Sequence, residues 1–459
     1  MVIHPFQTQF DKLTASKFKL RNRSIRERVK LLSKMEKSVL SYRQIFRDAL
    51  FSDFRKPFTE TDITELYVVL KEIRHAKANL RNWSRTESKE APLALLGTSA
   101  QVAYEGKGVC LILSPWNYPV NLLLSPLVSA IAAGNAVLLK PSEITPNTSA
   151  ALKKFIAETF SDSEVVLVEG GREVAEQLLE LPFDHIFFTG GHKVGSLVMQ
   201  AAAKQLISVT LELGGKSPVY IHHDANIKDA AEKINAAKLV NAGQSCIAPD
   251  YLLAHIDIAD ELIAELKNQS LKFFNHNNKN QNAYASIVNT NHYNRLLKMA
   301  GLQSGDSENE PNRIIPPLIV SEIPKVSELM EEEIFGPILP VVKVSNQEEA
   351  LKVMHQYPTT LSIYIFSRNG KVKEFFRQNT SSGSICYNEC AVQFLNPGLP
   401  FGGMHQSGIG RSHGKAGFLA FSNERVIFHQ RVGITTAKLL YPPYSNFKNK
   451  IVDLLLKYF

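Results

Sequence analysis

The sequence predicts an α/β protein with parallel, doubly wound sheets. Short, continuous apolar runs alternate with stretches of helical length from residue 106 to residue 204. The same alternation resumes at about residue 217 and continues to about residue 384. Alternation of this kind is typical of parallel sheets whose faces are covered by helices. Polar motifs follow several of the apolar runs, at the strand ends where doubly wound sheets bind their ligands.

The first hundred residues are predicted to be mainly helical. Residues 11–50 are rich in Lys and Arg, yet apolar residues recur among them at helical spacing, which indicates an amphipathic helix with an exposed basic face. Packing of this helix on the protein body is favoured over membrane binding. A second helix is expected over residues 60–79, with Thr59 as its N-cap, and residues 83–101 are expected to be extended. The apolar residues at helical spacing are Ile25, Val29, Leu32, Met35 and Val39.

The central part of the chain is predicted to form the first sheet. Four apolar runs are bounded by turn-forming residues and are expected to be buried strands, and the segments between them are expected to be helices. The strands cover residues 108–114, 136–140, 165–168 and 185–188. The helices end near Ala133, Phe160, Leu179 and Lys204. Further along, the Asn-rich stretch 275–282 is interpreted as a surface loop.

Length and composition indicate an ordinary globular protein. A chain of 459 residues suggests about three domains, and 44% hydrophobic with 21% charged residues is a typical composition. The net charge is +8, but no basic block is interleaved with aromatic residues, so nucleic-acid binding is not expected. The N-terminus has no apolar signal-peptide region, and no window reaches the roughly 18 apolar residues of a membrane span.

The cysteines indicate a reducing environment. Four of them in so long a chain do not form a disulfide framework. Cys386 and Cys390 are separated by three residues and have no histidine near them, so no metal site is expected. A cytoplasmic location fits these observations best, and it would also keep a reactive thiol free.

Two motifs point to covalent chemistry. Cys246 lies in a Gly/Ser turn, Asn241-Ala-Gly-Gln-Ser-Cys, just after an Ala-rich helical stretch. A single cysteine is more often a small buried apolar residue than a nucleophile. Glu212, however, lies 34 residues upstream at the end of an apolar run and is followed within two residues by a pair of glycines. A thiol nucleophile and a separate carboxylate base are what two-step acyl chemistry requires, although Glu212 could instead pair with Lys216.

Four segments resemble signature motifs of the aldehyde dehydrogenase superfamily. They are Leu211–Pro218 (LELGGKSP), Gly243–Cys246 (GQSC), Glu332–Pro337 (EEIFGP) and residues 400–418 (PFGGMHQSGIGRSHGKAGF), the last of which is similar to class 3, acting on fatty and aromatic aldehydes. The similarity extends from about Ser24 to about Tyr444, and several motifs in the same order make it specific. It implies a Rossmann-like cofactor domain, an α/β catalytic domain and a small β oligomerisation arm.

The resemblance also implies domain boundaries and an assembly. Residues 1–81 and 101–209 would bind NAD(P), and residues 210–387 would carry the nucleophile. Residues 82–100 and 388–430 would form an arm that bridges two subunits, which implies a homodimer. Residues 431–459 would be a C-terminal tail.

The resemblance assigns roles to the reactive groups. Cys246 would attack an aldehyde to give a thiohemiacetal, whose oxyanion would be stabilised by the side-chain amide of Asn117 and the backbone N–H of Cys246. Loss of hydride to a nicotinamide cofactor would leave a thioester, which water activated by Glu212 would hydrolyse. From the sequence alone, Asn117 is more simply a turn residue between two prolines.

The cofactor residues rest mainly on the resemblance, because the chain has no GxGxxG motif there. Residues 190–195 read GGHKVG, which suits a phosphate site at a helix N-terminus but also an ordinary tight turn. The resemblance places Gly190, Gly191 and Gly195 near the NAD phosphates, Lys140 and Glu143 at the adenosine ribose, Glu333 at the nicotinamide ribose and Phe335 beside the nicotinamide ring. A carboxylate such as Glu143 favours NAD over NADP, and NADP stays open as an alternative.

The substrate side is less determined by the sequence. Tyr118, Leu122, Phe394, Leu399 and Phe401 lie near the motifs and are candidates for the wall of a tunnel for medium- or long-chain aliphatic or aromatic aldehydes. They could equally be core residues. Three other functions stay open: transfer of the acyl group to coenzyme A, reduction of an acyl phosphate, and a non-enzymatic binding role. Glu212 argues against the first two, since neither needs a base that activates water.

Overall fold

The first of two sheets carries the predicted strands of the central region. The computed structural model describes residues 4–92, 95–279, 284–302, 312–323, 327–433 and 435–458. The sheet has the order β14-β7-β6-β3-β4-β5, parallel except for β14, which runs antiparallel to β7. Its strands are β3 (Val109–Leu113), β4 (Ala136–Lys140), β5 (Val165–Leu167), β6 (His185–Gly190), β7 (Ser208–Leu213) and β14 (Gly408–Ile409).

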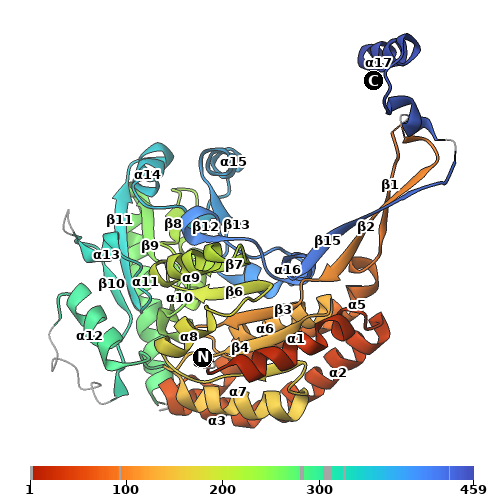
Figure 1. Cartoon of the computed structure of the whole chain (residues 1–459). Helices are drawn as coiled ribbons and strands as arrows, with labels where there is room; N and C mark the ends of the chain where they lie inside the picture. The colour runs from red at the N-terminus through yellow and green to blue at the C-terminus, as the bar shows by residue number, and fades with distance from the viewer. Residues whose placement is uncertain are drawn as a thin grey trace.

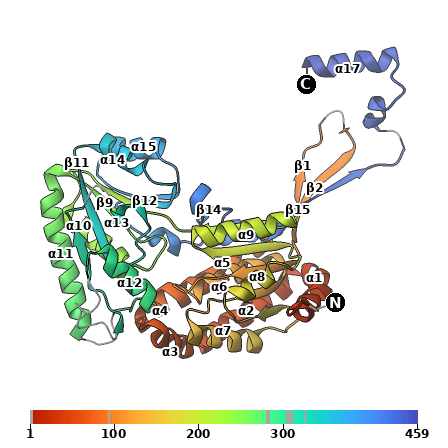
Figure 2. The ribbon, with the colours of Figure 1, turned by 60° about the vertical axis from the view of Figure 1, so that its left-hand side comes forward.

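Helices cover both faces of this sheet, as Figure 2 shows for α9 on one side and α6 on the other. Alternate side chains of β3 enter different cores: Leu111 packs with residues of α1, α8 and α9, whereas Ile112 packs with α2, α5, α6 and α7. The covering helices are α6 (Asn121–Ala133), α7 (Pro146–Thr159), α8 (Arg172–Leu178), α9 (His192–Lys204) and the N-terminal helices described next. The predicted doubly wound sheet is thus confirmed.

The N-terminal segment forms several helices rather than two. The predicted amphipathic helix is α2, in which Leu32, Met35 and Val39 are buried and Ser24 with Glu27 forms a capping box. The prediction of a helix starting at Glu60 with Thr59 as its cap was wrong. Helical structure begins at Phe58 directly after Pro57, whose ring already fixes a helix-compatible φ, so Thr59 lies inside the first turn. The elements are α1 (Gln7–Arg21), α2 (Ile25–Ser41), α3 (Arg43–Phe54), α4 (Phe58–Thr61), a π-helix (Asp62–Leu66) and α5 (Tyr67–Trp83).

The second sheet is parallel throughout and has the order β10-β11-β9-β8-β12-β13. Its strands are β8 (Pro218–Ile221), β9 (Tyr251–His255), β10 (Leu318–Val320), β11 (Ile338–Val344), β12 (Thr360–Phe366) and β13 (Ser382–Tyr387). Its helices are α10 (Ile227–Leu239), α11 (Ile256–Lys279), α12 (Thr290–Met299), α13 (Glu328–Glu331), α14 (Gln347–Met354) and α15 (Gly370–Asn379). The Asn-rich stretch 275–282 is not a loop as far as Lys279, because α11 continues to that residue; residues 280–282 lie outside the described residues.

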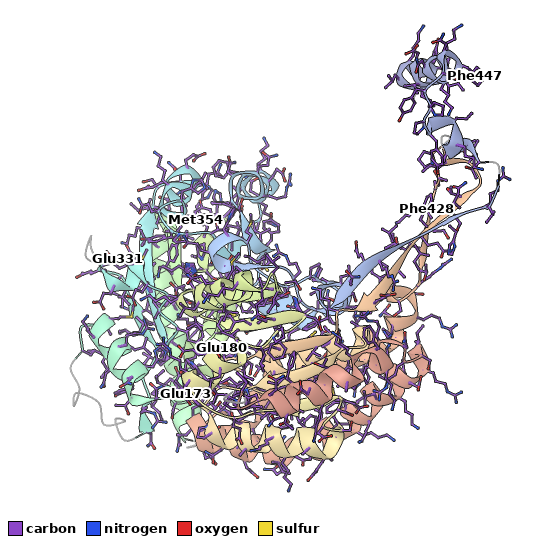
Figure 3. The ribbon with its side chains drawn as sticks, viewed as in Figure 1. Glu173, Glu180, Glu331, Met354, Phe428 and Phe447 are labelled. Carbon is purple, nitrogen blue, oxygen red and sulfur yellow. The ribbon has the colours of Figure 1, made fainter. Side chains whose placement is uncertain are left out.

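A long three-stranded arm extends away from the body (Figure 1). Its order is β1-β2-β15, antiparallel throughout, and it joins the segment expected to be extended to the C-terminal region. Phe428 on β15 and Phe447 on the last helix stand clear of the body (Figure 3) and are 50% and 67% exposed. The remaining elements are β1 (Glu87–Lys89), β2 (Thr98–Gly106), β15 (Ser422–Gln430), α16 (Gly414–Ala420) and α17 (Asn446–Tyr458). None of the described helices has the length and apolar character needed to cross a membrane.

Candidate active site

A cavity of about 490 Å³ brings most of the predicted site residues together. Parallel strands end at a common edge, so the segments after β3, β6 and β7 converge there. The predicted site residues in its wall are Asn117, Gly190, Gly191, Glu212, Cys246, Glu333 and Phe335. Lys140, Glu143 and Gly195 are not part of the wall.

Cys246 lies in a turn with unusual backbone geometry. Asn241, Ala242 and Gly243 have φ values of 56°, 52° and 74°, three consecutive left-handed residues after α10. The Asn241 amide donates to the Gln244 carbonyl at 3.1 Å, and the Gln244 amide donates back to the Asn241 carbonyl at 3.0 Å. A Cβ at position 243 would lie 2.3 Å from the Gly336 carbonyl oxygen, so only glycine fits there. The Asn241 and Gln244 side chains and the glycine at position 243 thus fix the backbone of the turn that carries the thiol.

The Cys246 thiol is neutral in this site. Burial, reinforced by Glu333 and Glu212, raises its pKa to about 12, and the backbone N–H groups of Cys246 and Ile247 lower it by less. Burial, together with two carboxyl groups, therefore outweighs the backbone N–H groups of this turn. Ionisation of this thiol requires a proton acceptor or an added positive charge.

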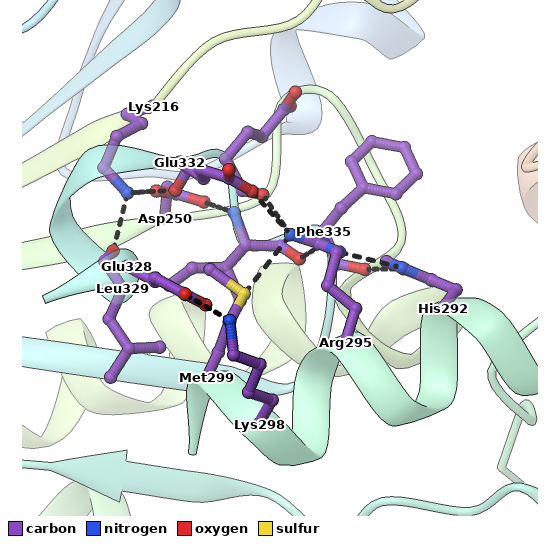
Figure 4. A network of polar contacts seen from close by, with 12 residues as sticks. Lys216, Asp250, His292, Arg295, Lys298, Met299, Glu328, Leu329, Glu332 and Phe335 are labelled. Carbon is purple, nitrogen blue, oxygen red and sulfur yellow. Dashed lines mark hydrogen bonds and ion pairs between the residues drawn. The ribbon is translucent and has the colours of Figure 1, made fainter. Parts of the chain in front are cut away.

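Glu212 is buried at the end of β7, with both carboxyl oxygens free of hydrogen bonds to the described residues. Burial raises its pKa to about 8, and nearby Ser412 and Arg411 lower it by less. The simpler interpretation, pairing with Lys216, is wrong. Lys216 forms an ion pair with Asp250 and donates to two backbone carbonyls (Figure 4). A buried, unpaired carboxyl in a cavity wall is a candidate general base.

Asn117 follows β3 and is fixed beside the Cys246 turn. Its side-chain amide donates to the Gln244 carbonyl at 3.1 Å, and its backbone carbonyl accepts from the Asn241 amide at 3.0 Å. An amide nitrogen carries two hydrogens, so one remains for a ligand. The structure thus brings Asn117 and the Cys246 turn together, across 129 positions of sequence.

The loop carrying Glu333 and Phe335 is held by side chains that donate hydrogen bonds to its backbone carbonyls (Figure 4). Lys216 donates to the Glu332 carbonyl at 2.8 Å, and Arg295 to the Glu333 carbonyl at 3.3 Å. His292 donates to the Phe335 carbonyl at 2.8 Å, and this contact supports a left-handed Phe335 with φ of 55°. Sequence reasoning missed His292 and Arg295, because the motifs carry no signal for partners 38 to 43 positions away.

Four of the predicted cofactor residues, Lys140, Glu143, Gly190 and Gly191, lie at the same edge of the first sheet. Gly190 ends β6 and Gly191 precedes α9, where a Cβ on Gly191 would meet nothing within 4 Å. Gly195 has a packing role instead, because a Cβ there would lie 2.6 Å from the Leu213 side chain. At the end of β4, Lys140 pairs with Glu143 at 3.1 Å. The open glycine turn and the unpaired Glu333 Oε1, whose carboxyl pKa burial raises to about 8, fit a dinucleotide.

The other walls of the cavity are mainly apolar. Tyr118, Leu122, Phe394 and Phe401 line it as predicted, whereas Leu399 does not and is 47% exposed. Sequence reasoning missed His413, whose ring lies 4.6 Å from Phe394 and 5.3 Å from Phe401 between centroids. Burial lowers the pKa of His413 to about 4, so the ring is neutral. Within the described residues, no group of three His, Cys, Asp or Glu side chains is arranged to hold a metal ion.

Comparison with known proteins gives the family. A sequence profile described as "Aldehyde dehydrogenase family" matches residues 11–427. The chain belongs to the aldehyde dehydrogenase family. This aldehyde dehydrogenase is 40% identical over 419 residues to the 4,4'-diaponeurosporen-aldehyde dehydrogenase of Staphylococcus aureus, covering 90% of this chain and 91% of that protein. It is 37% identical to aldehyde dehydrogenase family 3 member B3 of Mus musculus over 445 residues, covering 96% and 93%.

Solved structures agree with this assignment. The aldehyde dehydrogenase is similar to a structure described as the substrate-bound state of Staphylococcus aureus AldH, with a TM-score of 0.93 and 38% identity over 98% of this chain and 99% of that one. A Mycobacterium tuberculosis aldehyde dehydrogenase complexed with NAD⁺ has a TM-score of 0.81 at 24% identity, over 91% and 88%, which compares the fold alone. The predicted fold and the predicted family, with its class 3 relatives, are confirmed, and the chain is an oxidoreductase of a family that uses NAD or NADP.

Proposed function

We propose that this enzyme oxidises medium- or long-chain aliphatic or aromatic aldehydes to carboxylic acids through a thioester on Cys246. The observation that carries the proposal is the meeting of Cys246, Asn117 and an unpaired Glu212 in one largely apolar cavity. Family membership supports aldehyde oxidation, and the aromatic and aliphatic walls support an apolar substrate.

In the first half-reaction, Glu212 accepts the thiol proton and Cys246 sulfur forms a bond to the aldehyde carbon. The carbonyl oxygen then carries a negative charge, which the Asn117 amide and the Cys246 backbone N–H stabilise. Bound NAD or NADP would supply the hydride acceptor. Loss of hydride from the carbon restores the carbonyl and leaves the acyl group on the sulfur.

Before the second half-reaction, Glu212 releases the thiol proton to solvent. The carboxylate then takes a proton from a water molecule as that water attacks the thioester carbon. The carbon–sulfur bond breaks, the acid leaves, and the sulfur recovers its proton. The absence of hydrogen bonds to either Glu212 oxygen from the described residues supports this role, because the carboxylate is free to accept from water. Transfer to coenzyme A and reduction of an acyl phosphate are both disfavoured, since neither employs such a base.

For the cofactor, Gly190 and Gly191 would allow close approach of the phosphates, and Lys140 with Glu143 would hold the adenosine ribose. Glu333 would contact the nicotinamide ribose and Phe335 the ring. The half-exposed Glu143 carboxylate supports NAD over NADP, because a 2′-phosphate would be repelled.

A panel of aldehydes assayed with NAD and then with NADP tests this proposal. We expect hexanal, longer aliphatic aldehydes and benzaldehyde to yield NADH and the free acid, with a higher kcat/KM for NAD. Coenzyme A is expected to leave the rate unchanged. Activity only in the presence of coenzyme A, or none with any aldehyde, would contradict the assignment.

The pH dependence of acyl release follows from Glu212. As a base the carboxyl must be deprotonated, and its raised pKa of about 8 means that the active form is the minority at neutral pH. If hydrolysis limits turnover, kcat rises about tenfold per pH unit below this pKa and levels off above it. Steady-state kcat measured between about pH 6 and about pH 9.5 checks the prediction. A kcat that falls with rising pH over this range would contradict the base role.

The assembly and location are also proposed. The proposed division is a cofactor domain at 1–81 and 101–209, a catalytic domain at 210–387, an arm at 82–100 and 388–430, and a tail at 431–459. The pairing of β2 with both β1 and β15 supports the arm. Exposed Val426 and Phe428 on the arm support docking on a second copy, hence a homodimer. All four cysteines are unpaired, which supports a reducing, cytoplasmic location. Sedimentation at micromolar concentration tests the dimer, and a monomer would contradict it.

A further inference from the structure

Three charged side chains between α3 and α5, those of Lys56, Glu60 and Glu65, contact the backbone of the two loops that carry Asn117 and Cys246. Lys56 and Glu65 are completely buried, a rare state for these residues that requires partners. Glu60 is partly exposed, but its carboxyl group points inward to the Cys246 turn. None of the three lines the cavity. Their contacts therefore concern the backbone that carries the reactive groups.

Lys56 and Glu65 fix the loop that carries Asn117. Their charged groups pair at 2.6 Å, and the second Glu65 oxygen accepts the N–H of Asn121 at 2.8 Å. The Lys56 ammonium also donates to the Asn117 carbonyl at 3.5 Å and lies 4.0 Å from the centre of the Tyr118 ring. Both ends of residues 117–121 are thus anchored to one buried ion pair.

Glu60 fixes the turn that carries Cys246. Its Oε2 atom accepts the backbone N–H of Asn241 at 2.8 Å, the first of the three left-handed residues. A carboxylate at the C-terminal end of α10 opposes the helix dipole, which favours cations there. Burial also raises the pKa of Glu60 to about 7, so the charged form that accepts this hydrogen bond is disfavoured. General stability does not explain a group placed against both effects.

The two anchors form one connected set of contacts. Glu60 holds Asn241, whose side-chain amide donates to the Asn117 carbonyl at 3.0 Å, and Lys56 donates to that same carbonyl and to Glu65. We propose that Glu60 and the Lys56–Glu65 pair are positioning residues that set the distance between the Asn117 amide and the Cys246 backbone N–H. The inference rests on the proposed function, which assigns these two groups to the oxyanion.

Two substitutions of Glu60 test the proposal. Glu60→Gln keeps an oxygen that accepts the Asn241 N–H, whereas Glu60→Ala removes it. We expect Glu60→Ala to lower kcat about 10- to 100-fold with little change in the KM for aldehyde, because the contact serves the oxyanion rather than the ground state. Glu60→Gln is expected to keep kcat within about threefold of wild type.

A matched control separates positioning from stability. Glu36 accepts from Arg74 and Lys77 of α5, each at 2.7 Å, and none of the three lines the cavity. Glu36→Ala is therefore expected to lower the thermal midpoint without lowering kcat. If Glu60→Ala keeps the wild-type kcat, or if Glu60→Gln loses as much kcat as Glu60→Ala, the proposal is overturned.

Two further measurements keep the proposal testable if Glu60→Ala does not fold or if the wild type has no aldehyde activity. If Glu60→Ala does not fold, Asn241→Gly keeps the left-handed backbone and removes the amide that bonds the Asn117 and Gln244 carbonyls, and the same loss of kcat is expected. Alkylation of Cys246 by iodoacetamide, read against Cys386 in the same protein by mass spectrometry, needs no aldehyde activity. An unchanged ratio of the two rates in Glu60→Ala would overturn the positioning role, whereas an inactive wild type would contradict only the proposed function.

Discussion

Cys246→Ala is expected to lower aldehyde turnover by about 10⁴-fold or more, with the fold and cofactor binding intact. The reaction proposed here passes through a carbon–sulfur bond, and no other described cysteine occupies the Cys246 turn. Cys246→Ser should be similarly inactive, because a hydroxyl is a far weaker nucleophile than a thiolate at neutral pH. NADH formation under saturating substrate, with circular dichroism to confirm folding, measures the loss.

The matched control is Cys386→Ser. Cys386 lies half-buried on β13, where burial raises its thiol pKa to about 11, and it is not part of the cavity wall. Its replacement should leave kcat within about twofold of wild type, as for ordinary substitutions away from a site. Wild-type turnover by Cys246→Ala would refute the covalent mechanism, and equal losses in both variants would indicate a general effect on the fold.

The strands of the first sheet were predictable because each is apolar on both faces. Such runs have no helical periodicity, and glycine or proline bounds them, so β3, β4, β5 and β6 fall where the sequence places them. The boundary of the helix near residue 60 was not predictable in the same way. Thr59 has the side chain of a cap, but the helix has Pro57 as its N-cap and starts at Phe58, two residues before the predicted start at Glu60.

The reactive residues of the site were predictable and their supports were not. Cys246, Glu212 and Asn117 stand in recognisable motifs, and parallel topology explains why the segments after different strands meet at one edge. The partners of those motifs have no local signal: Lys216 binds Asp250 rather than Glu212, and Glu60 bonds a residue 181 positions away. Burial also raises the pKa values of Glu212, Glu333 and Cys246. The degree of burial depends on how the chain packs, which the local sequence does not reveal.

Glu212→Gln is expected to separate the two half-reactions. The amide cannot remove a proton from water, so acyl release should slow by about 10²- to 10³-fold, a loss typical of removing a general base. Glu212 accepts the thiol proton in the wild type, but the positive charge of bound NAD⁺ also favours ionisation of Cys246, so a first turnover should still occur in the variant. Rapid-mixing experiments should therefore show a burst of NADH close to one equivalent per active site, followed by a slow steady rate.

Mass spectrometry of the quenched burst distinguishes this outcome from a structural defect. In Glu212→Gln the acyl adduct should accumulate on Cys246, whereas the wild type should show less of it at the same time point. Because the Glu212 carboxylate raises the thiol pKa wherever it is ionised, its neutral replacement should make Cys246 no harder to ionise. A folded variant that forms neither a burst nor an adduct would contradict this prediction. It would mean that Glu212 is essential for attack by Cys246 and not only for hydrolysis of the thioester.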